Sequence, residues 1–294
     1  MTSGMAILLA LLCSITYGAG DFFGGTAARR VHPFAVGWSA HSIVLVPIAL
    51  AAALVGASHV ARKDVGWGAL GGLLGAAALL ALYAGLARGP MSIVAPTTAL
   101  MAASVPVVVG SVFQHERPSM WQWIGIGLAL VAIGVISISP GGDTDQASTN
   151  PGFNTTTFGL ALIAGIGFGM FFVALDQTSS SAGLWPLVAG RAASTVVFSV
   201  LVLTVTPLRR LVVTSAIRIN IATIMASAFL DLIANVFYLF ATRRGALSIV
   251  AVLSSLYPAS TIVLANRIHR EVLTRFQLAG LGIAGIAVAF VAAG

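Results

Sequence analysis

Four ionisable side chains lie inside apolar stretches of this sequence, where a charge is costly. They are Asp21, His41, Arg191 and Asp231. An ionisable group at the centre of a bilayer costs about 2.5–3.5 kcal/mol on insertion scales, so such groups normally face a protein interior or a water-filled cavity. In an apolar protein, these side chains could bind a polar solute, carry a proton or pair with one another.

Asp231 belongs to the most informative polar pattern. Asp231, Asn235 and Tyr238 are spaced i, i+4 and i+7, which puts a carboxylate, an amide and a phenol on one helix face. Such a face can hydrogen-bond an ammonium or hydroxyl group, and the carboxylate could also carry a proton. The alternative is a structural clamp between helices, in which Asp231 pairs with Arg191.

Asp21 and Arg191 are the other two charged candidates. Asp21 follows Tyr17 by one helical turn and shares its face. It could bind a cation or take up a proton, or it could simply be hydrated near the end of its apolar run. For Arg191 an ion pair with Asp176 or Asp231 is favoured, and the alternative is a role in holding a solute carboxylate.

The elements that must position these groups are transmembrane helices. Of the 294 residues, 58% are hydrophobic and 8% are charged, and the mean hydropathy is +1.01. Soluble domains carry about 25% charged residues, so this composition excludes a soluble enzyme, and its apolar content excludes a disordered chain. The net charge of +7 is spread over short loops, which favours contact with a membrane surface over nucleic-acid binding.

Ten runs are long and apolar enough to span a bilayer, which needs roughly 20 such residues. The predicted spans are Met5–Gly24, Phe34–Gly56, Gly66–Ala87, Met91–Phe113, Met120–Ile138, Thr157–Asp176, Leu184–Val205, Ile219–Thr242, Ala246–Asn266 and Leu273–Ala293. The longest connection is rich in Gly, Pro, Ser, Thr, Asp and Asn, which is typical of a polar linker. It divides the chain into residues 1–139, the linker 140–156 and residues 157–294.

The two sides of this linker repeat each other. Around the fourth and ninth spans the chain reads ARGPMSIVAPTTALMAASVPVV and RRGALSIVAVLSSLYPASTIVL, and further on Glu116 matches Glu271 and Gln122 matches Gln277. Since each half has five spans, the second half must enter the bilayer from the opposite face. The sequence therefore predicts an all-α integral membrane protein of ten transmembrane helices, with two inverted five-helix repeats around a central cavity.

The first spans of the two halves align more weakly. Tyr17-Gly18 matches Phe168-Gly169, and Pro33 matches Pro186. Asp21 then matches Phe172, so the two halves are not chemically equivalent at this position.

The repeated segments resemble the EamA group of the drug/metabolite transporter superfamily. The resemblance rests on YAGLARGPMSIVAP, on HERPSMWQWIGIGLALVAIGV and on their second copies, and it covers essentially the whole chain. It implies a cavity lined mainly by the first, third, fourth, sixth, eighth and ninth helices. Members carry amino acids, nucleobase-type metabolites, vitamins or drugs, often outward. This chain departs from the family pattern in the first span, where Asp21 follows Tyr17-Gly18 instead of a small or amide residue after Trp-Gly.

The resemblance also selects the residues expected around the cavity. The candidates for solute binding are Tyr17, Asp21, Tyr83, Thr97, Thr98, Asp231, Asn235, Tyr238, Ser254 and Tyr257. Asp21 and Asp231 are the candidates for proton coupling. Gating or structural roles are assigned to His41, Pro96, Arg191 and Pro258. His41 is interpreted as a hydrogen-bonded structural histidine, with a proton relay as the alternative, and the prolines as kinks or hinges.

The function expected from these features is secondary transport of a small organic metabolite, an amino acid or related solute, by export through alternating access. No catalytic, metal-binding or phosphate-binding motif is found, so no cofactor, no metal and no enzyme activity are expected. We expect a monomeric, multi-pass protein of the inner (plasma) membrane with no nucleic-acid partner. The alternatives are an integral-membrane lipid-modifying enzyme, a non-transporting scaffold or sensor, and a channel.

Overall fold

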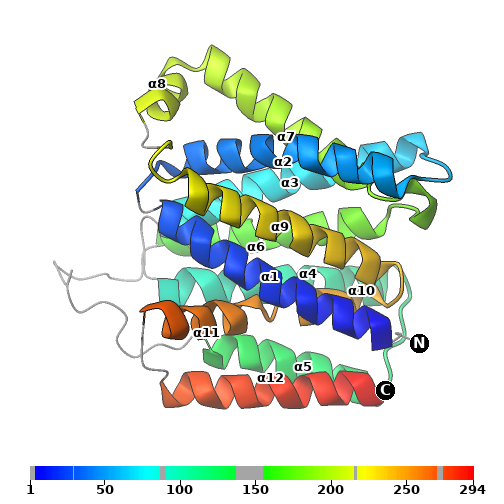
Figure 1. Ribbon diagram of the computed structural model, residues 1–294. Coiled ribbons are helices and arrows are strands. Elements are labelled where there is room, and N and C mark those ends of the chain that lie inside the picture. The colour runs from blue at the N-terminus through cyan, green and yellow to red at the C-terminus, as the bar shows by residue number, and fades with distance from the viewer. Residues whose placement is uncertain (1–3, 29, 87–90, 137–154, 215–216, 270–273) are drawn as a thin grey trace.

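A computed structural model describes residues 4–28, 30–86, 91–136, 155–214, 217–269 and 274–294. These residues form helices joined by short connections (Figure 1). The helices are α1 (Gly4–Ala28), α2 (Pro33–Val55), α3 (Arg62–Leu86), α4 (Met91–Val112), α5 (Met120–Ile136), α6 (Thr155–Asp176), α7 (Trp185–Thr204), α8 (Thr206–Thr214), α9 (Ile221–Thr242), α10 (Leu247–Ser254), α11 (Tyr257–His269) and α12 (Arg275–Ala293). The predicted linker, residues 140–156, lies outside the described residues except for its last two, which already belong to α6.

Seven of the described helices are long and apolar enough to cross a membrane: α1, α2, α3, α6, α7, α9 and α12. Shorter apolar helical stretches cover Thr97–Val112, Met120–Val135 and Leu247–Thr261. Large apolar side chains are exposed around the bundle, among them Leu54 at 88% and Phe113 at 74%. Such a surface suits a lipid environment, so the protein is an all-helical membrane protein, while the count of ten spans stays a prediction.

The ninth predicted span, Ala246–Asn266, is not one continuous helix. It is divided into α10 and α11, with Ser255 and Leu256 between them. Pro258 is the second residue of α11, where the missing backbone N–H removes no helical hydrogen bond. Pro258 therefore does not kink a continuous helix, as the sequence analysis expected, but lies in the first turn of a new one.

The last helix of each half begins with the same local structure. Ser119 and Gln122 form a reciprocal pair of hydrogen bonds at the start of α5, at 2.9 and 3.2 Å. Thr274 and Gln277 form the same pair at the start of α12, also at 2.9 and 3.2 Å. Each pair is a capping box, in which two side chains satisfy two backbone N–H groups that the helix leaves unpaired. The sequence match between Gln122 and Gln277 therefore has a structural counterpart.

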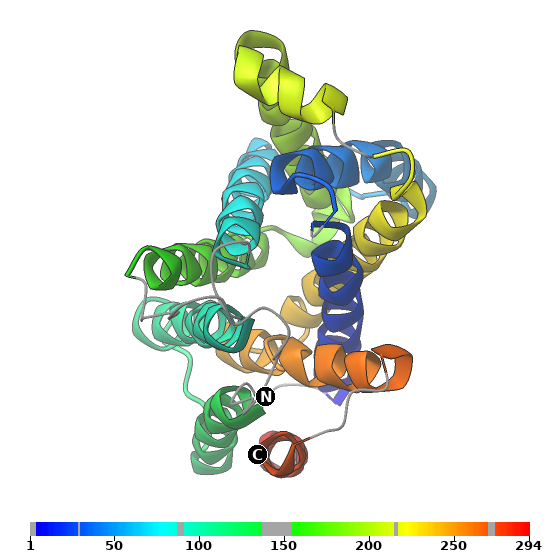
Figure 2. The same ribbon diagram turned by 90° about the vertical axis from the view of Figure 1, so that its left-hand side faces the viewer.

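The two halves of the chain are packed into each other. The most extensive helix contacts join α1 to α9, α5 to α12, and α6 to both α3 and α4. Seen along the bundle, α1, α9 and α11 lie opposite α3, α4 and α6 (Figure 2). Each of these pairs takes one helix from each half, and both apolar clusters of the described residues contain side chains from both halves.

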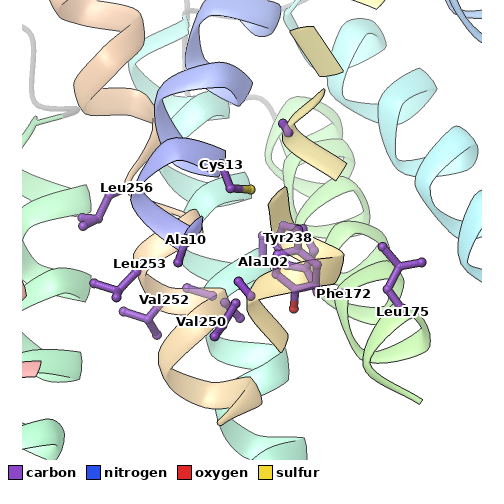
Figure 3. Packing of buried hydrophobic residues seen from close by; sticks show 14 of the residues in the cluster. Ala10, Cys13, Ala102, Phe172, Leu175, Tyr238, Val250, Val252, Leu253 and Leu256 are labelled. Atoms are coloured by element: carbon purple, nitrogen blue, oxygen red, sulfur yellow. The ribbon is translucent and has the colours of Figure 1, made fainter. Parts of the chain in front are cut away.

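The main apolar core surrounds α10. Every residue from Leu247 to Ser254 is buried, as expected for a helix that is apolar all round. Its neighbours include Ala10 and Cys13 of α1 and Ala102 of α4 (Figure 3). Within this core, the rings of Phe172 and Tyr238 stack with their centroids 4.2 Å apart.

Side chains at one end of the bundle, the end with the two termini, tie the two halves together. The Glu116 carboxylate accepts hydrogen bonds from the backbone N–H groups of Leu247, at 2.5 Å, and Ser248, at 3.1 Å, and so caps the start of α10. The Asp64 carboxylate accepts from the backbone N–H and the hydroxyl of Ser179, both at 2.8 Å. Within the second half, the Arg243 guanidinium donates to the Ser179 carbonyl at 3.1 Å, next to the contact of Ser179 with Asp64.

Glycines allow α3 and α7 to approach closely at the same end. A Cβ atom at Gly68 would lie 2.7 Å from Cα of Pro186, and one at Gly190 would lie 3.2 Å from Cα of Gly72. Ordinary side chains would force these two backbones apart.

We therefore expect the Gly72→Ala substitution to destabilise the protein by about 1–3 kcal/mol, because the added methyl group would overlap the backbone of Gly190. The measurement is thermal unfolding of the purified protein in detergent. Gly127→Ala is the matched control, since a Cβ at Gly127 in α5 meets nothing within 4 Å. Equal melting temperatures for the two variants would contradict the close packing of α3 and α7.

Candidate functional site

A pocket lies between the two halves, in the middle of the bundle. Its wall is formed by α1, α2, α3, α4, α6, α7, α9 and α11, and its open volume is about 70 Å³. The polar and charged lining residues are Tyr17, Asp21, His41, Arg191, Asp231, Asn235 and Tyr257. The resemblance implied a wall from the first, third, fourth, sixth, eighth and ninth predicted spans. These spans correspond to α1, α3, α4, α6, α9 and the pair α10–α11, and each of them contributes to the wall. α2 and α7 contribute as well.

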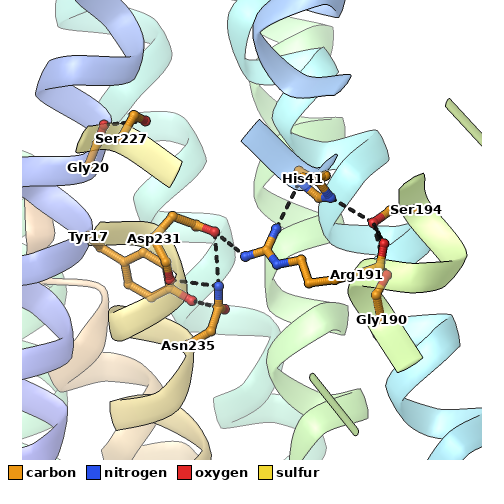
Figure 4. A network of polar contacts seen from close by, with 9 residues as sticks. All are labelled: Tyr17, Gly20, His41, Gly190, Arg191, Ser194, Ser227, Asp231 and Asn235. Carbon is orange, nitrogen blue, oxygen red and sulfur yellow. Dashed lines mark hydrogen bonds and ion pairs between the residues drawn. The ribbon is translucent and has the colours of Figure 1, made fainter. Parts of the chain in front are cut away.

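The Arg191 guanidinium is the centre of a polar network on one wall (Figure 4). Its Nη2 forms an ion pair with Oδ2 of Asp231, which joins α7 to α9. Of the alternatives that the sequence left open for Arg191, the structure shows Asp231 and not Asp176 as its partner. The Arg191 side chain is 11% exposed and that of Asp231 is 40% exposed, so the carboxylate has the larger surface open to the pocket.

His41 holds the guanidinium from the opposite side. Nη1 of Arg191 lies 3.0 Å from Nε2 of His41, and Nδ1 of His41 lies 2.7 Å from Oγ of Ser194. Because a guanidinium only donates, Nε2 must accept, and the ring proton must lie on Nδ1 and point to Ser194. Ser194 in turn donates to the backbone carbonyl of Gly190 at 2.9 Å. These directions require a neutral His41 ring while it contacts Arg191.

Asn235 and Tyr17 fix the other partner of the ion pair. Nδ2 of Asn235 donates to the Asp231 carboxylate at 3.1 Å and to the Asp231 backbone carbonyl at 2.8 Å. The Tyr17 hydroxyl donates to Oδ1 of Asn235 at 2.7 Å. The network therefore runs from α2 and α7 through α9 to α1, and so links the two halves across the pocket.

Asp21 is the second carboxylate in the pocket. It lines the same space as the Arg191–Asp231 pair and is half-buried. Within the described part of the chain, no hydrogen bond or ion pair joins it to another residue. Since Arg191 and Asp231 compensate each other's charge, an ionised Asp21 leaves the pocket with a net negative charge.

The wall facing these groups is aromatic. Phe168, Phe171 and Phe172 of α6 line the pocket. The ring of Tyr17 lies 6.1 Å from that of Phe172 and 6.5 Å from that of Tyr257, measured between centroids. These distances are typical of aromatic pairs, so rings form a continuous apolar surface next to the charged groups.

Comparison with protein families identifies the chain. The model of the EamA-like transporter family matches residues 4–138 and again residues 155–293. The chain belongs to the EamA-like transporter family. It is therefore a transporter of the drug/metabolite type with two copies of the family unit in one chain.

Two further proteins are similar to this chain. An uncharacterized protein of Methanocaldococcus jannaschii is 29% identical over 136 residues, which is 46% of this chain and 97% of that protein. The relative is thus about as long as one of the two family units. A crystal structure of another protein aligns with a TM-score of 0.75 and 16% identity, over 97% of this chain and 95% of that chain. At that identity, the likeness shows the fold alone.

Only half of the predicted solute-binding residues of this EamA-like transporter line the pocket. Tyr17, Asp21, Asp231, Asn235 and Tyr257 do so. Five others lie outside its lining: Tyr83, Thr97, Thr98, Tyr238 and Ser254.

The five residues outside the lining have surroundings of their own. Tyr238 and Ser254 are fully buried, and Tyr238 lies behind Phe172 and not on the pocket face of α9. Thr98 donates a hydrogen bond to the Ala161 carbonyl at 3.2 Å, which ties α4 to α6. Tyr83 is buried and belongs to a second apolar cluster, and Thr97 is half-buried.

The remaining predicted residues divide between the pocket and other places. His41 and Arg191, assigned gating or structural roles, both line the pocket. Pro96 lies within α4, and its side chain is outside the described residues. The described residues contain no group of three or more His, Cys, Asp or Glu side chains that could hold a metal ion.

The sequence analysis did not identify Ser194 or the phenylalanines of α6 as residues of the site. The repeat contained a signal for the first of these. If Pro33 is aligned with Pro186, His41 aligns with Ser194, and these two side chains are in contact. The repeat therefore made the correspondence of these two positions detectable, although it did not predict their contact between α2 and α7.

The ion pair predicts a strong coupling between two substitutions. Arg191→Met alone leaves the Asp231 carboxylate without its cation and should lower stability by about 2 kcal/mol, a value reduced from the fully buried case because Asp231 is 40% exposed. The double variant Arg191→Met/Asp231→Leu should recover at least half of that loss. Thermal unfolding of both single variants, the double variant and the wild type measures the coupling. If the double variant loses as much stability as the two single variants together, the two side chains do not stabilise each other.

Proposed function

We propose that this EamA-like transporter is a secondary carrier that exports a small organic metabolite, an amino acid or a related solute, by alternating access. The observation that carries the proposal is one pocket that holds the Arg191–Asp231 pair and the separate Asp21 carboxylate. Asp21 suits the ammonium group of such a solute. Arg191 suits its carboxylate, because a guanidinium binds carboxylates through parallel hydrogen bonds. The aromatic wall suits an apolar side chain.

The proposed architecture is two inverted repeats of five spans each, formed by residues 1–139 and 157–294, in the inner (plasma) membrane. The two matched family units support this division. A further support is that α1 begins at the end of the bundle with the termini, while α6 begins at the opposite end (Figure 1). We propose that the protein acts as a monomer, since the pocket is lined by both halves of one chain.

The size of the pocket supports alternating access over a permanently open channel. An open volume of about 70 Å³ is small beside the pockets of about 300–1,000 Å³ that usually hold organic ligands. This difference supports a movement of the helices when a solute enters. The hydrogen bonds of Glu116 and Asp64 at the terminal end are contacts between the halves that would break when that end opens.

Proton coupling is part of the proposal. Asp21 and Asp231 are the titratable acids of the pocket, and protonation of Asp231 would release Arg191 from its ion pair. No loop of the sequence is long enough for an ATPase domain, so an ion or solute gradient is the proposed energy source.

The test is uptake and counterflow in proteoliposomes with a pooled, labelled set of amino acids, nucleosides and vitamins. We expect saturable counterflow of one solute class, reduced at least tenfold by Asp21→Asn and by Asp231→Asn. Collapse of the pH gradient should abolish accumulation but not counterflow. Asp176→Asn is the matched control, because this carboxylate lies outside the pocket at the end of α6.

Other outcomes would overturn the proposal. Flux that does not saturate would indicate a channel. Equal counterflow in the Asp21→Asn, Asp231→Asn and Asp176→Asn variants would show that transport does not use this pocket. Accumulation that is unchanged without a pH gradient would exclude proton coupling. If the folded protein transports none of these solutes, the alternative functions, a membrane scaffold or a lipid-modifying enzyme, would be favoured.

A further inference from the structure

A short helix at the edge of the bundle takes no part in the pocket. α8 follows α7 directly and lies at the periphery, at the end of the bundle opposite the termini (Figures 1 and 2). The sequence analysis expected only a connection here. The segment TPLRRLVVT is too short to span a membrane, so α8 must have a different place relative to the bilayer.

The two faces of α8 differ in character. Val212 is buried and packs, with the half-buried Leu208, in the apolar cluster that includes Phe34 and Phe198. Leu208 and Val212 are four residues apart and so share the face that attaches α8 to the bundle. Arg209 and Arg210, by contrast, are exposed.

Apolar and positively charged side chains are exposed together beside α8. Leu203, near the end of α7, is 75% exposed, and Ile219, after α8, is 86% exposed. Arg218 is exposed next to Ile219. This combination is typical of the boundary between acyl chains and headgroups, where apolar side chains enter the bilayer and guanidinium groups meet phosphates.

The charge at the end of the bundle opposite the termini also favours contact with lipid phosphates. Exposed arginines at this end are Arg30, Arg209, Arg210, Arg218, Arg267 and Arg275. The acidic residues that the structure describes lie elsewhere: Asp21 and Asp231 line the pocket, and Asp64, Glu116 and Asp176 lie at the terminal end. Among described residues, this end is therefore uniformly basic.

We propose that α8 and Arg218 form a binding site for anionic phospholipids, with the guanidinium groups of Arg209, Arg210 and Arg218 on the lipid phosphates and Leu203 and Ile219 against the acyl chains. Arginine suits this task because its planar donors match phosphate oxygens. A lipid bound here also holds the end of α7, the helix that carries Arg191 into the pocket. The site is independent of the transported solute.

The experiment counts the lipids that the full-length, detergent-purified protein retains. Native mass spectrometry is performed during titration with phosphatidylglycerol, phosphatidylcholine or inorganic phosphate. Each basic residue near an anionic surface contributes roughly fivefold to affinity, so Arg209→Gln/Arg210→Gln/Arg218→Gln should weaken phosphatidylglycerol binding at least tenfold. Phosphatidylcholine should bind weakly to the wild type and to the variant.

Two further variants make the result specific. Arg62→Gln/Lys63→Gln/Arg117→Gln removes the same charge from exposed residues at the terminal end and should leave phosphatidylglycerol binding within twofold of wild type. Arg209→Lys/Arg210→Lys/Arg218→Lys keeps the charge and should retain most of the binding. An equal loss in both glutamine variants, equal retention of the two lipids, or full competition by millimolar inorganic phosphate would overturn the proposal.

Discussion

The ion pair between Arg191 and Asp231 is the interaction on which the centre of this protein depends. Neither charge can be left alone in an apolar bundle, so α7 and α9 must approach at this level. His41 accepts from the guanidinium and Asn235 donates to the carboxylate, so each charged group has a second, neutral partner. The pair is thus held in place without further charges, and among the described groups of the pocket Asp21 is the one carboxyl group that no cation or hydrogen-bond donor pairs.

The sequence predicted the helices better than it predicted their contacts. Apolar length and the repeated SIVA segment predicted where the helices lie, because both depend on residues near one another in the chain. The break between α10 and α11 was missed, because nothing in the apolar pattern distinguishes a helix that is buried on all sides from one that crosses lipid. α8 was missed because it has only nine residues, and its apolar face is apparent only against its neighbours.

For the candidate site, residue type was informative and orientation was not. The rarity of charge in apolar runs selected Asp21, Arg191, Asp231 and His41, and all four line the pocket. Helical spacing also grouped Tyr238 with Asp231, because a seven-residue step returns to nearly the same face of a helix. In the structure the Tyr238 ring is buried and stacks on Phe172 behind the pocket wall, a contact that helical spacing alone does not predict.

The divergence of the two halves explains how a duplicated chain obtains one asymmetric pocket. Asp21 and Phe172 occupy matching positions, and both line the pocket, one on α1 and one on α6. His41 and Ser194 also match and are hydrogen-bonded to each other. Two identical units would present the same group twice, and two carboxylates facing each other in so small a volume would repel. With Phe172 at the position that matches Asp21, the pocket has no such repulsion and has an aromatic side chain in the same lining as the Asp21 carboxylate. The chemical difference between the halves therefore gives one pocket both charged and aromatic lining groups.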